Sequence, residues 1–292
     1  MKAIVSRNNN KFSKTLKIFF ITMSTLWIYS VNSEQISVMT EILPLEGPEA
    51  LDGVKLLSVA VGSYPEHLGS DDYKIGLAPS LRFESKNSSR YIQLVGPELV
   101  LNIVNSDTWS FGPAFNYRFG RDGNKTFVGV DGMQRIDDTV EIGAFIGWRK
   151  VDSNEFRNRF SARLQFLSDT GNVHKGYIVN ASAQVMRRIA LPVDLFLSGA
   201  MSYADNNYMQ TYFGIDDKNM GVSDFPLYQP NSGLRDVRLS FGTLIHFSRS
   251  WHIAVGGQYQ RLLRHAANSP IVKFEGSRNQ WVSGIAVVYA WE

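Results

Sequence analysis

The sequence predicts an all-β protein, a transmembrane antiparallel up-and-down β-barrel of ten to twelve strands. Three observations predict it. Apolar and polar residues alternate strictly over long runs, which is the period of an extended strand. The runs reach or exceed the roughly 9 to 11 residues that cross a bilayer on a tilt. The connections between runs alternate between long and short, which is typical of bacterial outer-membrane barrels.

The first 33 residues predict a secretory signal peptide. Five basic residues and no acidic residue lie within the first seventeen positions, and a mostly apolar run follows over 18–31. A spanning helix needs roughly 20 apolar residues, so this run fits a cleaved leader better than an anchor, which is the alternative. We expect cleavage after Ser33, then a periplasmic or loosely ordered lead-in over 34–53 within a single barrel domain over 34–292.

The net charge of the chain comes from this leader. The whole sequence has 30 basic and 27 acidic residues; without the five basic residues of the leader, 25 basic residues face 27 acidic ones, a net charge of −2. A nucleic-acid partner is therefore not expected, because it would require clustered Lys and Arg. The chain has no cysteine, so neither a disulfide framework nor a thiolate metal site can hold it together.

The first half of the mature chain contains five alternating runs. In 73–84 the apolar face begins with Tyr73 and Ile75, and in 109–119 an aromatic ladder runs from Trp109 to Phe119 against small or polar residues. The other runs predicted as single strands are 90–104, 139–149 and 156–166. Alternation alone does not distinguish a soluble core face from a lipid-facing one, but strands this long favour the membrane.

Five further runs complete the ten expected strands. They span 176–189, 193–204, 233–247, 250–263 and 279–291. Tryptophans lie at strand ends, as expected for the aromatic girdles of a membrane barrel: Trp109, Trp148, Trp251, Trp281 and Trp291. Two weaker candidates, 54–63 and 208–213, would raise the count to twelve.

The connections predict an orientation. If 73–84 runs outward, the long segments 121–137, 205–232 and 264–278 lie outside, and the short ones near 105–107, 190–192 and 248–250 lie in the periplasm. The weak strand 54–63 fits this alternation only if another short strand restores parity. The C-terminus is then periplasmic.

One predicted strand has an unusual polar face. Arg157, Arg159 and Arg163 alternate with apolar residues, so we expect these arginines to face the lumen. They could select anions in a channel, or pair internally with Glu141 and similar residues, which is the reading we favour because a barrel of this size is commonly filled by side chains.

Several sequence blocks resemble the MipA/OmpV family of outer-membrane proteins. They are GSDDY over 69–73, WSFGP over 109–113 with YRFGRD over 117–122, DNNYMQTYFG over 205–214, and AANSPIV over 266–272 with GSRNQ over 276–280. The resemblance implies location in the outer membrane and a barrel fold. It marks these motif residues in loops as candidate functional positions: Ser70, Asp71, Asp72, Tyr73, Asn268, Ser269 and Pro270.

The resemblance also implies a function. The protein that gives the family its name is a scaffold joining a murein-hydrolysing lytic transglycosylase to a peptidoglycan synthase. For this chain we therefore expect a non-enzymatic scaffold or adaptor, with outer-membrane lipid or lipopolysaccharide and the two murein enzymes as candidate partners. The alternative is a passive, porin-like channel for small solutes.

Catalytic chemistry receives little support from the residues. His67 lies near Asp71 and Asp72, which could form an acid–base site at the rim, but solvated loop carboxylates are the more common case. The sequence has no G-x-S-x-G nucleophile motif and no phosphate-binding loop. His246 and His252 flank a tight turn without an obvious third ligand. We expect no catalytic residue, cofactor or metal site.

Overall fold

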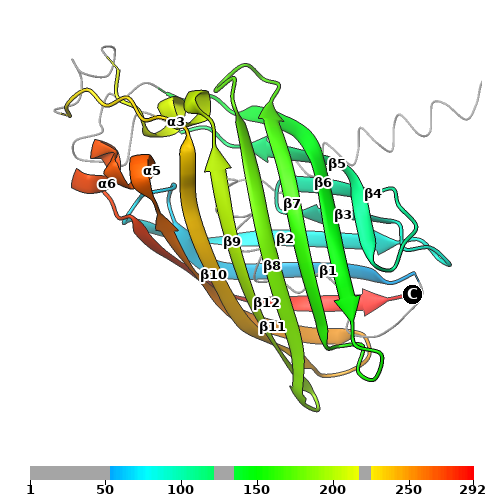
Figure 1. Ribbon diagram of the computed structural model, residues 1–292. Helices are drawn as coiled ribbons and strands as arrows, with labels where there is room; N and C mark the ends of the chain where they lie inside the picture. The colour runs from blue at the N-terminus through cyan, green and yellow to red at the C-terminus, as the bar shows by residue number, and fades with distance from the viewer. Residues whose placement is uncertain (1–52, 122–134, 217–224) are drawn as a thin grey trace, which may run out of the picture. The chain divides into compact units, whose positions relative to one another are not determined.

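The structure, a computed structural model, describes residues 53–121, 135–216 and 225–292, and the predicted leader with nearly all of the lead-in lies outside them. Twelve antiparallel strands form a closed barrel in which sequence neighbours pair and β1 pairs with β12 (Figure 1). The strands are β1 (Lys55–Pro65), β2 (Tyr73–Glu84), β3 (Tyr91–Val95), β4 (Glu98–Asn102), β5 (Trp109–Arg118), β6 (Thr139–Val151), β7 (Arg159–Asp169), β8 (Tyr177–Ala190), β9 (Val193–Ala204), β10 (Gly233–His246), β11 (Trp251–Leu262) and β12 (Asn279–Trp291). The described residues also form three short helices: α3 (Asn206–Phe213), α5 (Arg264–Asn268) and α6 (Pro270–Phe274). Within the described part of the chain, no helix is long and apolar enough to cross a membrane.

The predicted all-β barrel is confirmed, with corrections to individual elements. The run 90–104 is not one strand but the hairpin β3–β4. Gly96 turns the chain with φ of 52°, a left-handed backbone that glycine adopts without steric cost. The weak candidate 54–63 is the strand β1, whereas 208–213 is helical and forms most of α3.

The hairpin also reverses the predicted direction of 73–84. It supplies the extra short strand that parity required, so β2 runs from the rim with the long connections to the rim with the short turns. The long-loop rim carries the connections 66–72, 119–138, 170–176, 205–232 and 263–278. The short-turn rim carries 85–90, 103–108, 152–158, 191–192 and 247–250, together with the C-terminal end of β12. Because long loops face outward in bacterial barrels, we assign the long-loop rim to the outside and the short-turn rim to the periplasm.

The two faces of each strand differ in exposure as the alternation predicts. In β5 the aromatic ladder points away from the lumen, with Trp109 and Phe111 about half exposed, while Ala114 and Asn116 between them are buried. Aromatic pairs mark both ends of the wall. Phe83–Trp291 and Trp251–Tyr289 lie near the short-turn rim, and Tyr259–Trp281 and Phe166–Tyr177 near the long-loop rim. The outer wall is therefore an apolar belt between two aromatic girdles.

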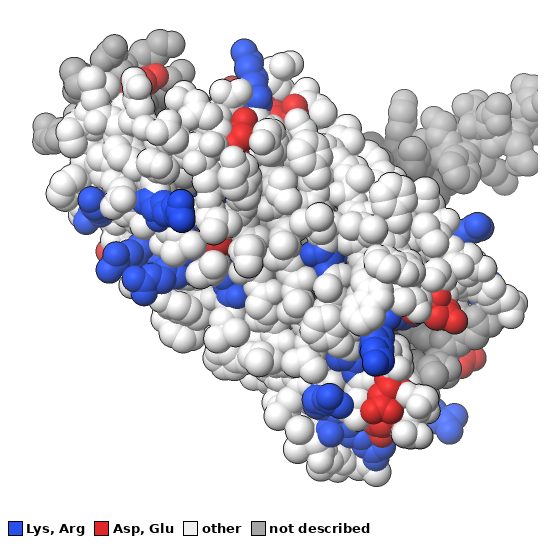
Figure 2. All heavy atoms as spheres, viewed as in Figure 1, with Lys and Arg blue, Asp and Glu red and all other residues white. Residues whose placement is uncertain are grey.

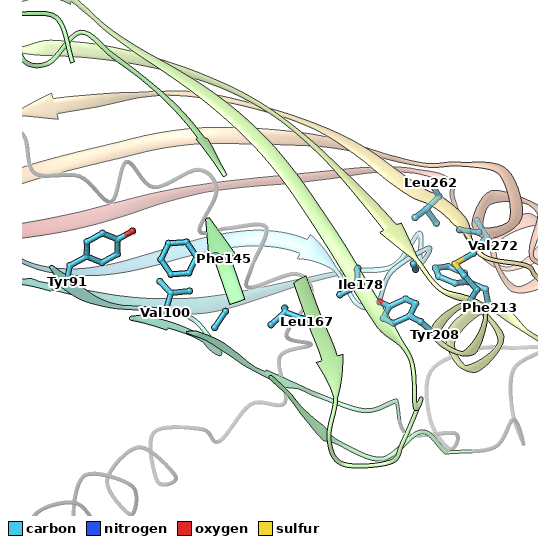
Figure 3. Packing of buried hydrophobic residues seen from close by; sticks show 13 residues of the cluster. Tyr91, Val100, Phe145, Leu167, Ile178, Tyr208, Phe213, Leu262 and Val272 are labelled. Carbon is cyan, nitrogen blue, oxygen red and sulfur yellow. The ribbon is translucent and has the colours of Figure 1, made fainter. Parts of the chain in front are cut away.

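Side chains fill most of the lumen. An apolar cluster runs from Tyr91, Val100 and Phe145 to Tyr208 and neighbouring residues at the other end (Figure 3). Polar inward residues are equally buried: Ser58, Ser80, Gln93, Gln258 and Gln280 are no more than 5% exposed. Inward side chains of a water-filled pore would be accessible to solvent, so the interior is packed at these positions, while Arg163, Asn180 and Ser182 on β7 and β8 remain partly exposed.

Close strand contacts depend on small residues at a few positions. A Cβ atom on Gly143 would lie 1.8 Å from the backbone carbonyl oxygen of Phe166 on β7, far inside van der Waals contact. A Cβ atom on Gly199, by contrast, would meet nothing within 4 Å. Glycine is therefore required by packing at Gly143 and not at Gly199.

Candidate functional site

The most elaborate set of side chains lies where α3 enters the mouth of the barrel at the long-loop rim (Figure 3). The helix begins after Asp205, whose carboxylate accepts the amide N–H of Tyr208 at 3.0 Å as an N-cap. The same oxygen accepts the amide N–H of Tyr177 at 3.0 Å, which ties the start of α3 to β8. Three residues of this helix are buried: Tyr208, Met209 and Phe213.

Tyr208 is the centre of the site and is completely buried. Its hydroxyl oxygen accepts hydrogen bonds from Arg118 Nη1, at 3.2 Å, and from Arg235 Nη1. Both guanidinium groups also lie near the face of its ring, 5.1 Å and 5.4 Å from the centroid. The His174 ring packs edge-on against the same ring, with the centroids 5.2 Å apart.

Glu141 on β6 is the carboxylate of this site and is also completely buried. Its carboxylate accepts hydrogen bonds from Arg118 Nε at 2.8 Å and Arg118 Nη2 at 2.9 Å, a bidentate pair. It also accepts one from Asn116 Nδ2 at 2.7 Å and contacts His174 Nε2 at 3.0 Å. A buried carboxylate with this many partners is fixed in place, and removal of one partner would leave a buried charge uncompensated.

A second ion pair extends the network across the lumen to β10. Arg235 Nε donates to Asp236 Oδ2 at 2.6 Å, and Arg238 Nε lies 3.4 Å from Asp236 Oδ1. Arg238 Nη2 then donates to Ser202 Oγ on β9 at 3.1 Å. Charged groups from β5, β6 and β10 thus meet around one tyrosine of α3. We call Arg118, Glu141, Tyr208, Arg235 and Asp236 the mouth network.

The motif residues of the β1–β2 connection lie next to this network. Ser70 is buried, forms a bridge with Gly276, and its carbonyl oxygen accepts a hydrogen bond from Gln280 Nε2 at 2.9 Å. The Tyr73 hydroxyl accepts the amide N–H of Trp281 at 3.0 Å. Asp71 and Asp72 are exposed.

The motif residues of the β11–β12 connection approach from the other side. Ser269 is completely buried, and its hydroxyl donates to the carbonyl oxygen of Phe213 in α3 at 2.7 Å. Pro270 is buried at the first position of α6, where its missing N–H costs no hydrogen bond, and Asn268 is exposed. The structure therefore brings together blocks that are up to about two hundred residues apart in the sequence.

The three predicted lumen arginines lie away from this cluster. Arg157 is buried, with Nη1 3.3 Å from Asp194 Oδ1 and Nε 3.6 Å from Glu155 Oε1. The guanidinium of Arg163 lies 4.7 Å from the centroid of the Phe145 ring, and its Nη1 is 3.9 Å from Glu98 Oε1. Arg159 begins β7, opposite Met186 on β8.

The pKa of His67 does not suit the acid–base site that its neighbours Asp71 and Asp72 suggested. Burial, together with the positive charges of Arg121 and Lys74, lowers the pKa of His67 to about 3. The imidazole is therefore neutral between pH 5 and 8. A cavity of about 30 Å³, roughly enough for a water molecule, lies beside it and is lined in part by Arg118, Arg121 and Phe213.

At the opposite rim, two histidines form a cluster with a carboxylate that the sequence did not reveal. His246 Nε2 contacts Asp194 Oδ2 at 2.8 Å, and His246 Nδ1 contacts His252 Nδ1 at 2.9 Å. These contacts are hydrogen bonds, which leave no space for an ion between the groups. Among the described residues, no group of three or more His, Asp or Glu side chains has the geometry to hold a metal ion.

Sequence reasoning missed the mouth network, although one signal was available. Apolar and aromatic residues recur here with the spacing of one face of a helix, and an Asp that can cap a helix precedes them. These residues are Tyr208, Met209, Tyr212 and Phe213. That pattern could have predicted α3. Arg118 and Glu141, in contrast, become partners only through the pairing of β5 with β6.

Comparison with known proteins agrees with the barrel. A family model described as MltA-interacting protein MipA matches residues 57–291. Outer membrane protein Omp26La of Vibrio anguillarum is 26% identical over 189 residues, and outer membrane protein OmpV of Vibrio cholerae is 27% identical over 189 residues. Each match covers 64% of this chain and 66% of the relative's own length.

Solved outer-membrane barrels resemble the structure more distantly. The COG4313 outer membrane channel from Pseudomonas putida F1 has a TM-score of 0.48 at 9% identity, with 85% of this chain and 99% of that chain covered. The translocator domain of the autotransporter NalP from Neisseria meningitidis has a TM-score of 0.41 at 10% identity, with 88% and 93% covered. The family match spans nearly the whole described barrel, and the relatives are outer-membrane proteins. The chain therefore belongs to the MipA family of outer-membrane barrel proteins.

Proposed function

We propose that this protein is a non-enzymatic scaffold or adaptor of the outer membrane, which anchors envelope proteins at its periplasmic rim. The observation that carries the proposal is the packed lumen, because inward side chains from Ser58 and Gln93 to Tyr208 are nearly inaccessible to solvent. A barrel whose interior is filled serves as an anchor more readily than as a conduit. Its contribution to function then lies at its rims.

The periplasmic rim has an apolar surface suited to a protein partner. Ile189, Leu191 and Phe247 are 62%, 74% and 65% exposed, and we call these three residues the periplasmic tip. Ile189 and Leu191 belong to the β8–β9 hairpin, and Phe247 follows β10, which pairs with β9. Exposed Arg187 and Arg249 flank them. An apolar centre with a charged rim is the usual anatomy of a protein–protein interface.

The family description supports a choice of partner for this surface. The family is described as MltA-interacting, and MltA in the resembled scaffold is the murein-hydrolysing lytic transglycosylase. We therefore propose that the periplasmic tip contacts a murein hydrolase, and that a peptidoglycan synthase joins the same assembly. The outer-membrane position of the barrel supports this proposal, since both enzymes would reach it from the periplasm.

A crosslinking pull-down from intact envelopes, analysed by mass spectrometry, tests the proposal. The native barrel should retain a murein hydrolase or synthase, and Leu191→Asp combined with Phe247→Asp should reduce its recovery at least tenfold. The matched control is Leu227→Asp, which changes an exposed leucine at the opposite rim. Recovery of no murein enzyme with the native barrel, or equal recovery with the tip variant, would contradict the proposal.

A passive channel is the second candidate. It is favoured by Arg163, whose side chain is 28% exposed on the inward face of β7. Anion conductance that disappears with Arg163→Gln would support this role over that of a scaffold.

A further inference from the structure

A group of basic side chains lies on the outer wall of the barrel at the long-loop rim. It consists of Arg261 at the end of β11, Arg264 in α5, Lys273 in α6 and Arg278 just before β12. All four side chains are exposed, and Figure 2 shows Lys and Arg side chains gathered on the wall beneath α5 and α6. We call these four residues the basic shelf.

Strand pairing places Arg261 and Arg278 of the basic shelf close together. Arg261 lies directly opposite Asn279 on β12, next to Arg278 in the chain. The carbonyl oxygen of Arg278 accepts the amide N–H of Leu262 at 2.8 Å, which fixes this connection to the end of β11. Lys273 and Arg264 come from the two helices between these strands. The backbone of the shelf is therefore ordered by hydrogen bonds and by helix geometry.

No carboxylate among the described residues forms an ion pair with any of the four cations. This differs from the interior, where Arg118, Arg157 and Arg235 all have carboxylate partners. Arg264 also has a φ of 45°, a left-handed backbone that arginine rarely adopts. Glu275 is the one carboxylate of the same connection and is only partly exposed, so the shelf presents an excess of positive charge outward, where an anion could neutralise it.

The depth of the basic shelf in the membrane indicates which anion binds there. Tyr259 and Trp281 lie opposite each other with ring centroids 5.0 Å apart, and Trp281 is 53% exposed. Such pairs mark the level of the lipid headgroups. Arg261 is two residues beyond Tyr259 on the same face of β11, which is about 7 Å further along the strand toward the outside.

The wall below the aromatic pair suits lipid chains. Val255, Ile285 and Val287 are exposed on the outer faces of β11 and β12. Above the pair, Phe274 is 66% exposed beside Lys273. Apolar surface, aromatic pair and cations follow one another along the membrane normal, in the same order as acyl chains, glycerol or sugar backbone and phosphate in a lipid.

We propose that the basic shelf is a binding site for the phosphorylated headgroup of an outer-leaflet glycolipid, namely the lipid A part of lipopolysaccharide. Its phosphate groups accept hydrogen bonds from the arginines, and its acyl chains lie on the apolar wall below. The site is independent of the scaffold role, which depends on the opposite rim. It binds one lipid at a defined position on the circumference of the barrel, next to β11 and β12.

Binding of fluorescent lipid A to the folded full barrel in detergent micelles tests this site. Arg261→Gln with Arg278→Gln should weaken binding roughly 30-fold, since each basic side chain near a membrane surface contributes about fivefold. The matched control, Arg187→Gln with Arg249→Gln, removes two exposed arginines at the periplasmic rim and should leave binding unchanged. Heat-modifiable migration in electrophoresis verifies that all variants are folded.

Two further binding measurements identify which part of the lipid is bound. Dephosphorylated lipid A should bind at least tenfold more weakly than lipid A, and inorganic phosphate at the same concentration should not displace lipid A. Equal binding of lipid A by the shelf variant, equal binding of the dephosphorylated lipid, or full displacement by inorganic phosphate would each overturn the assignment.

Discussion

The mouth network should contribute measurably to the stability of the barrel. Two substitutions of Tyr208 separate the contribution of its hydroxyl hydrogen bonds from that of its ring packing. Tyr208→Phe removes only the hydroxyl, which accepts hydrogen bonds from Arg118 and Arg235. A hydrogen bond to a charged group contributes about 1.5 to 3 kcal/mol. Both arginines keep a carboxylate partner, so we expect the lower end of the range for each bond, a loss of about 3 kcal/mol in total.

Tyr208→Ala removes the ring as well. The ring is completely buried and packs against His174, with Arg118 and Arg235 near its face. Truncation of a buried aromatic residue to alanine costs about 3 to 5 kcal/mol, so this variant should lose about 6 kcal/mol or more once the hydroxyl is included. The expected order of stability is native, then Tyr208→Phe, then Tyr208→Ala.

Urea unfolding in lipid vesicles, followed by tryptophan fluorescence, measures these differences as changes in the free energy of unfolding. The control is Tyr203→Phe, at a tyrosine in the aromatic girdle that stacks on Tyr177. It should change the free energy by less than about 0.5 kcal/mol. A loss of less than about 0.5 kcal/mol for Tyr208→Phe, or equal losses for both Tyr208 variants, would refute the role given to the network.

Three further predictions address α3, strand packing and pH. Asp205→Ala removes a carboxylate that accepts two backbone N–H groups and should speed amide hydrogen exchange across α3 at least tenfold, whereas exchange should be unchanged in Asp71→Ala; equal exchange in both would contradict the cap. Gly143→Ala places a Cβ against a carbonyl oxygen of β7 and should abolish heat-modifiable folding, whereas Gly199→Ala should fold normally; a folded Gly143→Ala barrel would contradict the packing. Because the pKa of His67 falls from 6.5 to about 3 on folding, the unfolded chain binds more protons between those values, so native stability decreases as pH falls below about 6.5. The free energy of unfolding of the native protein minus that of His67→Phe should therefore decrease from pH 7 to pH 4, and a constant difference would exclude this titration.

Much of the barrel could be predicted because the physical cause is local. Alternation from Trp109 to Phe119 gives both the strand and its two faces, since successive side chains point in opposite directions. The same cause explains the failure at 90–104. Apolar residues continue through Gly96, so the pattern hides a turn that depends on one glycine with positive φ and the proline after it.

The candidate site was less accessible to sequence reasoning because its contacts are not local. Ser70 and Gly276 meet only when β1 and β12 close the barrel, and Arg118 meets Tyr208 only when α3 folds into the mouth. Family motif blocks indicated which segments matter but not that they converge. The basic shelf was equally hidden, since its four cations are spread over two helices and two strand ends.

Planar-bilayer recording is the most direct measurement of whether the lumen is closed, as the scaffold role requires. The native barrel, inserted and verified as folded, should show no ion conductance, because inward residues such as Ser80, Gln258 and Tyr208 are buried from solvent. Tyr208→Ala should introduce transient openings by loosening α3 at the mouth. Stable conductance through the native barrel, of the same size as that through Tyr208→Ala, would contradict a closed lumen and favour the channel.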